Sequence, residues 1–319
     1  MSEKILYLRD NIRPQEEENV QIHITGGSSI SSKLEFFNDD TGEQIWEPLH
    51  NKTVIAGAGL TLQKLFGFDR SVLNNTPTYD QVMNLDDAAN YSAYPTISVT
   101  NPATGEVIGS IPDESQRTII GFCLGSAGAG IEATNVFPEL YAYWIKPDVM
   151  VPFRYPLESA DDVDEDIYKG KKTITLSNGQ VRCAYYFKTF ANTPNLVQNY
   201  VSTIGVFDDL VTPSKVYEST ASADKAQSFV ELHLKVTKAD CREFFIAHNG
   251  LDQSKINQIS LVSGWKKNVT RQKLNSSGVV TSGEYEVFQQ VRPFSICNFP
   301  TEILSDREKA ISIIYTLYA

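Results

Sequence analysis

Strict alternation of apolar and polar residues is the feature that most limits how this chain can fold. In residues 229–236, the polar residues Glu231, His233 and Lys235 separate four apolar ones: Val230, Leu232, Leu234 and Val236. Successive side chains of a β-strand point to opposite faces, so this pattern predicts a half-buried strand. His233 falls on the polar face, which favours a solvated strand residue over a catalytic one.

Turn residues between further strand-like segments predict hairpins. Asn178-Gly179 divides residues 172–190 into two such segments, and asparagine followed by glycine favours a type I′ turn. A second hairpin is predicted over residues 96–111, with Gly105 in its loop. Further strand-like patterns occupy residues 256–265, 285–299 and 309–319. The chain is therefore predicted to be mainly β.

One segment favours a helix that packs against the strand before it. Thr237 is a good N-cap residue, and Asp240 three positions later makes the sequence resemble a capping box. The Asn-Gly pair that follows the segment can end a helix. We therefore predict a helix over residues 238–248 that buries Phe244 or Phe245.

The amino-acid composition of the sequence changes near residue 95. Residues 1–94 are rich in Asn, Asp, Gly, Ser and Thr, with apolar residues only in short groups, and we predict an extended N-terminal segment there. Residues 95–319 contain most of the strand patterns and are predicted to form one core domain. The predicted fold is mainly β: a sandwich-like or open-barrel β core with one packed α-helix and an extended N-terminal segment.

Two glycine-rich stretches raise the question of nucleotide binding. Residues 57–59 read Gly-Ala-Gly, and residues 128–133 read G-x-G-x-x-A, a permitted form of the dinucleotide-binding fingerprint. Such a site needs a helix after the glycines, but Pro138 follows Gly130 too closely for one. We predict no bound cofactor. The glycines instead suit a turn that packs closely against another backbone, of this chain or of a neighbouring subunit.

Other signs of chemistry are sparse. The cysteines, which we predict to be reduced core residues, show no C-x-x-C spacing, and the four histidines are scattered: we predict no metal site and no catalytic residues. A formal net charge of −11 argues against nucleic-acid binding through a basic surface. No apolar run has the length of a membrane span. A carboxylate pair for glycoside hydrolysis stays open, because such pairs meet only in space.

Aromatic residues and prolines are concentrated in residues 136–155. Prolines at positions 138, 147 and 152 interrupt this segment and exclude a long helix. Such a segment can cross a surface and place aromatic anchors in pockets. We therefore predict interface residues here: Trp144, Phe153, Arg154 and Tyr155. An ordinary core-lining loop is the alternative.

Four phrases together resemble a family of virion structural proteins of large tailed bacteriophages. The first, "FCLGSAGAGIEATNVFPELYAYWIKPDVMVPFRYPL", combines a glycine-rich turn with the run Met-Val-Pro-Phe-Arg-Tyr. The others are "AYYFKTFANTP", "KADCREFFIAHNGLDQSKINQISLVSGW" and "QVRPFSICNFPTEILSDREKAISIIYTLYA". The resemblance covers residues 95–319, and residues 1–94 resemble no family that we can name.

This resemblance implies a structural protein of the virion, made in the host cytoplasm and present in several copies as a ring or ring-associated homo-oligomer. Its partners would be other virion proteins, and the family supplies no catalytic residues. The head-to-tail neck or collar is the expected position, with a baseplate, tail or capsid-decorating position as alternatives. A virion-borne carbohydrate-binding or glycan-hydrolysing module is the alternative of another class. For it, the tryptophans Trp46, Trp144 and Trp265 are the first residues to consider.

Overall fold

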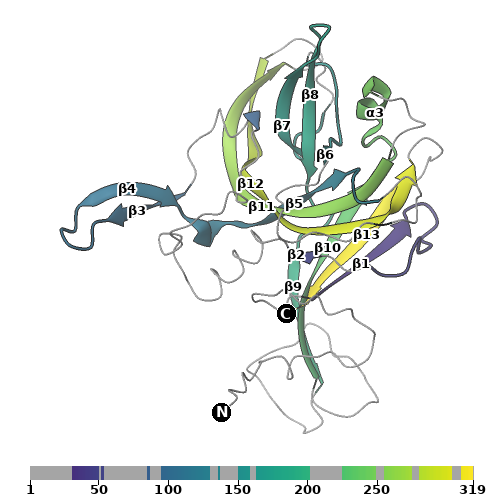
Figure 1. Cartoon of the computed structure of the whole chain (residues 1–319), viewed down its shortest axis with the longest axis horizontal. Helices are drawn as coiled ribbons and strands as arrows, with labels where there is room; N and C mark the ends of the chain where they lie inside the picture. Colours follow the sequence, from purple (N-terminus) through teal and green to yellow (C-terminus); the bar gives the residue numbers. More distant parts are fainter. Residues whose placement is uncertain are drawn as a thin grey trace, which may run out of the picture.

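The computed structural model of the chain confirms a mainly β fold with a packed helix (Figure 1). It describes residues 31–49, 52–53, 85–86, 95–129, 136, 150–158, 163–201, 225–248, 255–274, 280–303 and 310–318. Within these ranges, α3 (Arg242–His248) is the α-helix whose residues are all described. Most of the predicted extended N-terminal segment lies outside the described residues.

The smaller sheet has four antiparallel strands in the order β1 (Ser31–Asn38), β13 (Ile311–Tyr318), β10 (Lys225–Val236) and β9 (Asn195–Val201). The alternation in β10 behaves as predicted, since Leu232, Leu234 and Val236 are buried while the side chain of His233 is about half exposed. The core begins earlier than the predicted boundary at residue 94, because β1 pairs along the whole of β13.

The larger sheet is also antiparallel. Its order is β2 (Lys52–Thr53), β12 (Val280–Ile303), β11 (Lys255–Leu274), β5 (Thr118–Gly125), β8 (Val181–Lys188) and β7 (Tyr168–Thr175), and β6 (Met150–Val151) pairs with β5. The two sheets share one hydrophobic core, to which β1, β10 and β13 contribute from one side and β5, β11 and β12 from the other. This arrangement is sandwich-like.

The opposite face of the larger sheet is also covered. A second apolar cluster contains residues of β5, β8, β11 and β12 together with Leu85. The sheet curls as well, since the Lys169 Nζ on β7 donates to the Glu286 carbonyl oxygen on β12 at 2.6 Å. A buried cation on an edge strand thus joins two strands that no backbone ladder connects among the described residues.

Both predicted hairpins form, but one turn differs from the prediction. Strands β7 and β8 pair in register, yet only Gly179 of the Asn-Gly pair has a positive φ, of 80°. The Gly179 N–H donates to the Leu176 carbonyl at 2.9 Å, and the Asn178 Oδ1 accepts the Gln180 N–H at 3.0 Å. The type I′ prediction was therefore wrong: the loop has three residues and ends in a left-handed glycine, another common hairpin connection.

The second hairpin, β3 (Thr96–Thr100) with β4 (Val107–Pro112), forms a sheet of its own. It projects away from the rest of the molecule (Figure 1). On β4, the side chains of Val107 and Ile108 are 61% and 64% exposed.

The helix is shorter than predicted, but one of its two phenylalanines is buried as expected. It begins at Arg242, because the preceding Cys241 has a left-handed φ of 66° that a continuous helix from residue 238 would not allow. Asp240 does reach back to accept the Thr237 N–H at 2.7 Å, but this bond closes a turn that precedes the helix. Phe245 is buried in the shared core, which confirms its predicted role, while Phe244 is only partly buried.

Candidate functional site

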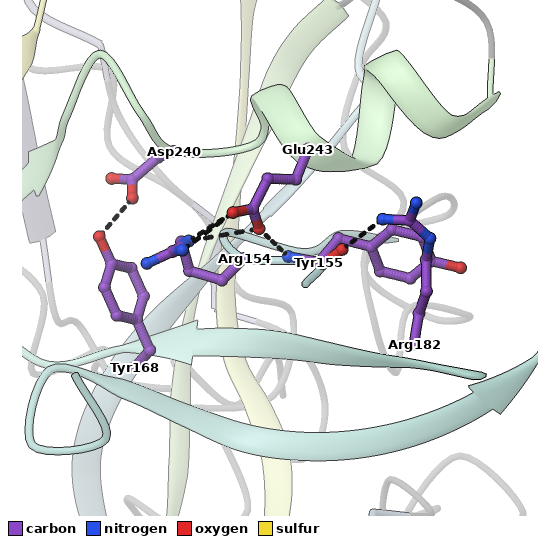
Figure 2. Close-up of polar contacts among 6 residues, drawn as sticks. All are labelled: Arg154, Tyr155, Tyr168, Arg182, Asp240 and Glu243. Carbon is purple, nitrogen blue, oxygen red and sulfur yellow. Dashed lines mark hydrogen bonds and ion pairs between the residues drawn. The ribbon is translucent and has the colours of Figure 1, made fainter. Parts of the chain in front are cut away.

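The segment 150–158 carries three of the four predicted interface residues and lies between α3 and the β7–β8 hairpin (Figure 2). Its backbone is bound on both sides. The Phe153 N–H donates to the Tyr185 carbonyl oxygen at 2.9 Å, and the Cys241 N–H donates to the Phe153 carbonyl oxygen at 2.7 Å. The fourth predicted residue, Trp144, lies outside the described residues.

Phe153 and Tyr155 are core residues of this chain. Their exposed fractions are 0% and 1%. The Phe153 ring meets the Phe122 ring edge-on at 5.3 Å between centroids, and the Tyr155 ring meets the Phe244 ring at 5.5 Å. For this part of the segment the structure agrees with the alternative of a core-lining loop. These two rings could anchor a partner only by leaving the core.

Arg154 forms an ion pair with Glu243 in the first turn of α3. Its Nη2 lies 2.8 Å from the Glu243 Oε1, and the other carboxylate oxygen accepts the Tyr155 N–H at 2.6 Å. The carboxylate therefore binds a side chain and a backbone group of the same segment, as Figure 2 shows. From the other side, the Arg182 guanidinium on β8 donates to the Tyr155 carbonyl oxygen at 2.9 Å.

A second, fully buried cluster is centred on Asp240, which has no exposed surface. Its Oδ2 lies 2.6 Å from the Lys188 Nζ, and its Oδ1 accepts the Tyr168 hydroxyl at 2.7 Å. Burial, followed by the Asp240 charge, raises the pKa of Tyr168, so this phenol stays protonated and donates. The ammonium also lies 5.7 Å from the centre of the Phe153 ring. The cluster joins the turn before α3 to strands β7 and β8.

Sequence reasoning did not find these polar partners. Asp240 was interpreted as half of a capping box, and nothing in its own neighbourhood of the sequence marks Tyr168 as its partner or Glu243 as the partner of Arg154. One signal was available: Lys188 directly follows the apolar run Ala184–Phe187, where a charged side chain in register with buried ones needs a counter-ion. The arrangement works as a cross-link, because each group of the clamp (Arg154, Glu243, Lys188, Asp240 and Tyr168) is bonded to another part of the same chain.

The glycine-rich turn packs closely against a backbone, as predicted for a structural role. The Gly128 N–H donates to the Asn257 Oδ1 at 2.7 Å, and a Cβ atom at this glycine would lie 2.2 Å from the Asn257 carbonyl oxygen. The neighbouring backbone belongs to β11 of the same chain. Gly130 and residues 57–59 lie outside the described residues, so the prediction that no nucleotide binds there stays a prediction.

Replacing Gly128 by alanine is expected to lower the free energy of unfolding by about 1–3 kcal/mol, because the added methyl group must displace backbone. Gly109→Ala is the matched control, since a Cβ there meets nothing within 4 Å and its φ is not positive. Urea unfolding followed by tryptophan fluorescence measures both changes. Equal unfolding midpoints for the two variants would contradict the close packing of Gly128.

The four cysteines are free and buried, as predicted. Burial raises the pKa of the Cys123 thiol to about 12 and raises that of Cys241 as well. Both thiols are therefore protonated at neutral pH and poor nucleophiles.

Trp265 is also buried, with the Arg117 guanidinium 4.1 Å above its ring, so it offers no open platform for a sugar.

The part of the chain that the structure describes contains no group of three or more His, Cys, Asp or Glu side chains placed to hold a metal ion. Likewise, no helix in these ranges is both long and apolar enough to cross a membrane.

Comparison with known proteins found no matching family model, no matching curated protein and no matching solved structure.

Proposed function

We propose that this protein is a structural component of a tailed bacteriophage particle, where it assembles in several copies with other virion proteins. The head-to-tail neck or collar is the position that we favour, with the baseplate, tail and capsid surface as alternatives. The resemblance over residues 95–319 supports this proposal, and one structural observation carries it: the projecting β3–β4 hairpin with its exposed apolar residues (Figure 1).

The hairpin supports an assembly role because it is poorly suited to stand alone. A two-stranded hairpin is marginally stable in water without a third strand or a packed element. Exposed apolar strands with open edges also tend to pair with other chains, and proteins normally protect them. Val107 and Ile108, at the bulge of β4, are both exposed. A neighbour in an assembly would cover them.

The clamp around segment 150–158 supports a mechanical rather than a catalytic role. Its charged groups bind one another instead of pointing into an open cavity: Arg154 pairs with Glu243, and Lys188 with Asp240. Such cross-links fix the position of the helix on the sheet. A rigid core with a projecting contact element is what a repeated building block of a particle requires.

We expect this protein to copurify with infectious particles through a density gradient, in a fixed ratio to the major capsid protein by quantitative mass spectrometry. An antibody against the chain should then label one position on the particle in electron micrographs. A cytoplasmic host protein of similar abundance serves as the control and should be lost in the gradient. Loss of this protein together with that control would contradict the proposal.

A further inference from the structure

The strands that end each sheet differ in how their open edges are protected. The outer edge of β1 is covered by its own chain: the Leu34 N–H donates to the Leu49 carbonyl oxygen at 2.7 Å, and the Leu49 N–H donates to the Leu34 carbonyl oxygen at 2.9 Å. The edge strand β7 carries Lys169, Lys171 and Lys172. Lysine on an edge strand and coverage by a loop are both common ways to prevent pairing with another chain.

The outer edge of β9 and the two outer edges of the β3–β4 hairpin have neither protection. The seven residues of β9 read NLVQNYV, and β3 and β4 read TISVT and VIGSIP, without one charged side chain in a sequence that is 21% charged. Among the described residues, no strand pairs with the outer edge of β9 or of the hairpin. Leu196, on β9, is also exposed. These are the edges at which pairing with another chain costs no buried charge.

The hydrogen bonds within the hairpin show which of its two edges has an uninterrupted row of outward backbone N–H and C=O groups. The Asp113 N–H donates to the Pro95 carbonyl, and the Asn101 N–H donates to the Glu106 carbonyl. Bonded and non-bonded pairs alternate in an antiparallel ladder, so the backbone groups that point outward on β3 belong to Thr96, Ser98 and Thr100. On β4 the corresponding outward position at Pro112 has no N–H, and a bulge interrupts the ladder at Val107.

We propose that the outer edge of β3 in one copy of this chain pairs with the outer edge of β9 in a second copy. The two edges match in lacking charge and in length, five residues against seven. Figure 1 shows the hairpin projecting from a different side of the molecule than β9. Each copy can therefore give its hairpin to one neighbour and its β9 edge to another, and such a head-to-tail contact closes into a ring or continues as a filament.

This inference rests on the proposed function only for the expectation that several copies assemble, and it names the contact. Its test uses two proline variants of the full chain. Ser98→Pro removes an outward N–H of β3 without removing a bond inside the hairpin, and Ser110→Pro does the same on β4, because these two residues face each other. By sedimentation velocity, we expect Ser98→Pro to weaken self-association at least about tenfold. Ser110→Pro should associate like the natural chain.

A second variant tests the other edge. Leu196→Lys places a charge on β9 and should also weaken self-association. A mixture of Ser98→Pro and Leu196→Lys chains retains one intact hairpin and one intact β9 edge, so it should form dimers and nothing larger. Any of three results would overturn the contact. The natural chain could stay monomeric at every concentration used in the sedimentation experiment, the two proline variants could weaken self-association equally, or the mixture could form no dimer.

The two proposals can fail separately. Self-association through the hairpin in a protein that is absent from particles would leave the β3–β9 contact standing and remove the virion role. A protein found in particles whose Ser98→Pro variant still associates and incorporates normally would retain the virion role and remove the contact.

Discussion

Replacing Asp240 by asparagine is expected to lower the free energy of unfolding by about 3–5 kcal/mol, because the change leaves a buried cation without its counter-ion. The side chain of Lys188 is only 6% exposed, and its Nζ lies 2.6 Å from the Asp240 carboxylate. An asparagine oxygen could still accept the Tyr168 hydroxyl, so the lost charge is the main difference. Urea unfolding at pH 7, followed by fluorescence, measures the change.

A surface ion pair provides the matched control. Asp39 lies 2.6 Å from the Lys235 Nζ, but both side chains are partly exposed to water, at 27% and 45%. Asp39→Asn should therefore cost less than about 1 kcal/mol. Adding Lys188→Met to Asp240→Asn should restore part of the stability, because the unpaired charge is then gone. Equal losses for Asp39→Asn and Asp240→Asn would contradict the burial of the Asp240 cluster.

Strand positions could be predicted from the sequence because their signal is local. Alternation in β10 and the turn residues of the two hairpins depend only on neighbouring positions, and the structure confirms these elements. The shape of a turn is less local: the Asn178 side chain bonds the Gln180 backbone, and this bond accompanies a three-residue loop in place of the type I′ turn. The burial of Phe245 follows from helical spacing, but the late helix start depends on the left-handed Cys241.

The candidate site could not be predicted in this way, because its contacts join distant parts of the chain. Arg154 binds a helix that begins 88 residues later, and Lys188 binds Asp240 across 52 positions. Aromatic density alone does not say whether Phe153 and Tyr155 face a partner or their own core. In the same way, the average composition of residues 1–94 did not predict strand β1, because its partner β13 lies at the other end of the sequence.

Phe153→Ala is expected to lower the free energy of unfolding of the isolated chain by about 3–5 kcal/mol, because the ring is fully buried against Phe122 and truncation leaves a cavity. Leu157→Ala in the same segment is the control. That side chain is exposed, so its removal should cost no more than about 0.5 kcal/mol. The two variants differ by their burial in the chain itself, and unfolding in urea at a low protein concentration keeps self-association out of the measurement.

Phe153 and Asp240 should also be coupled, because both act on Lys188, whose ammonium lies over the Phe153 ring and beside the Asp240 carboxylate. The double variant should differ from the sum of the single ones by about 0.5–3 kcal/mol, as is usual for residues that share a partner. If Phe153 instead anchored a partner, Phe153→Ala would leave the isolated chain as stable as Leu157→Ala does. Its effect on the free energy of unfolding would add to that of Asp240→Asn without coupling, and Phe153→Ala would weaken only the assembly with the partner. The double-variant cycle on the monomer therefore decides whether residues 150–158 belong to the core or to an interface.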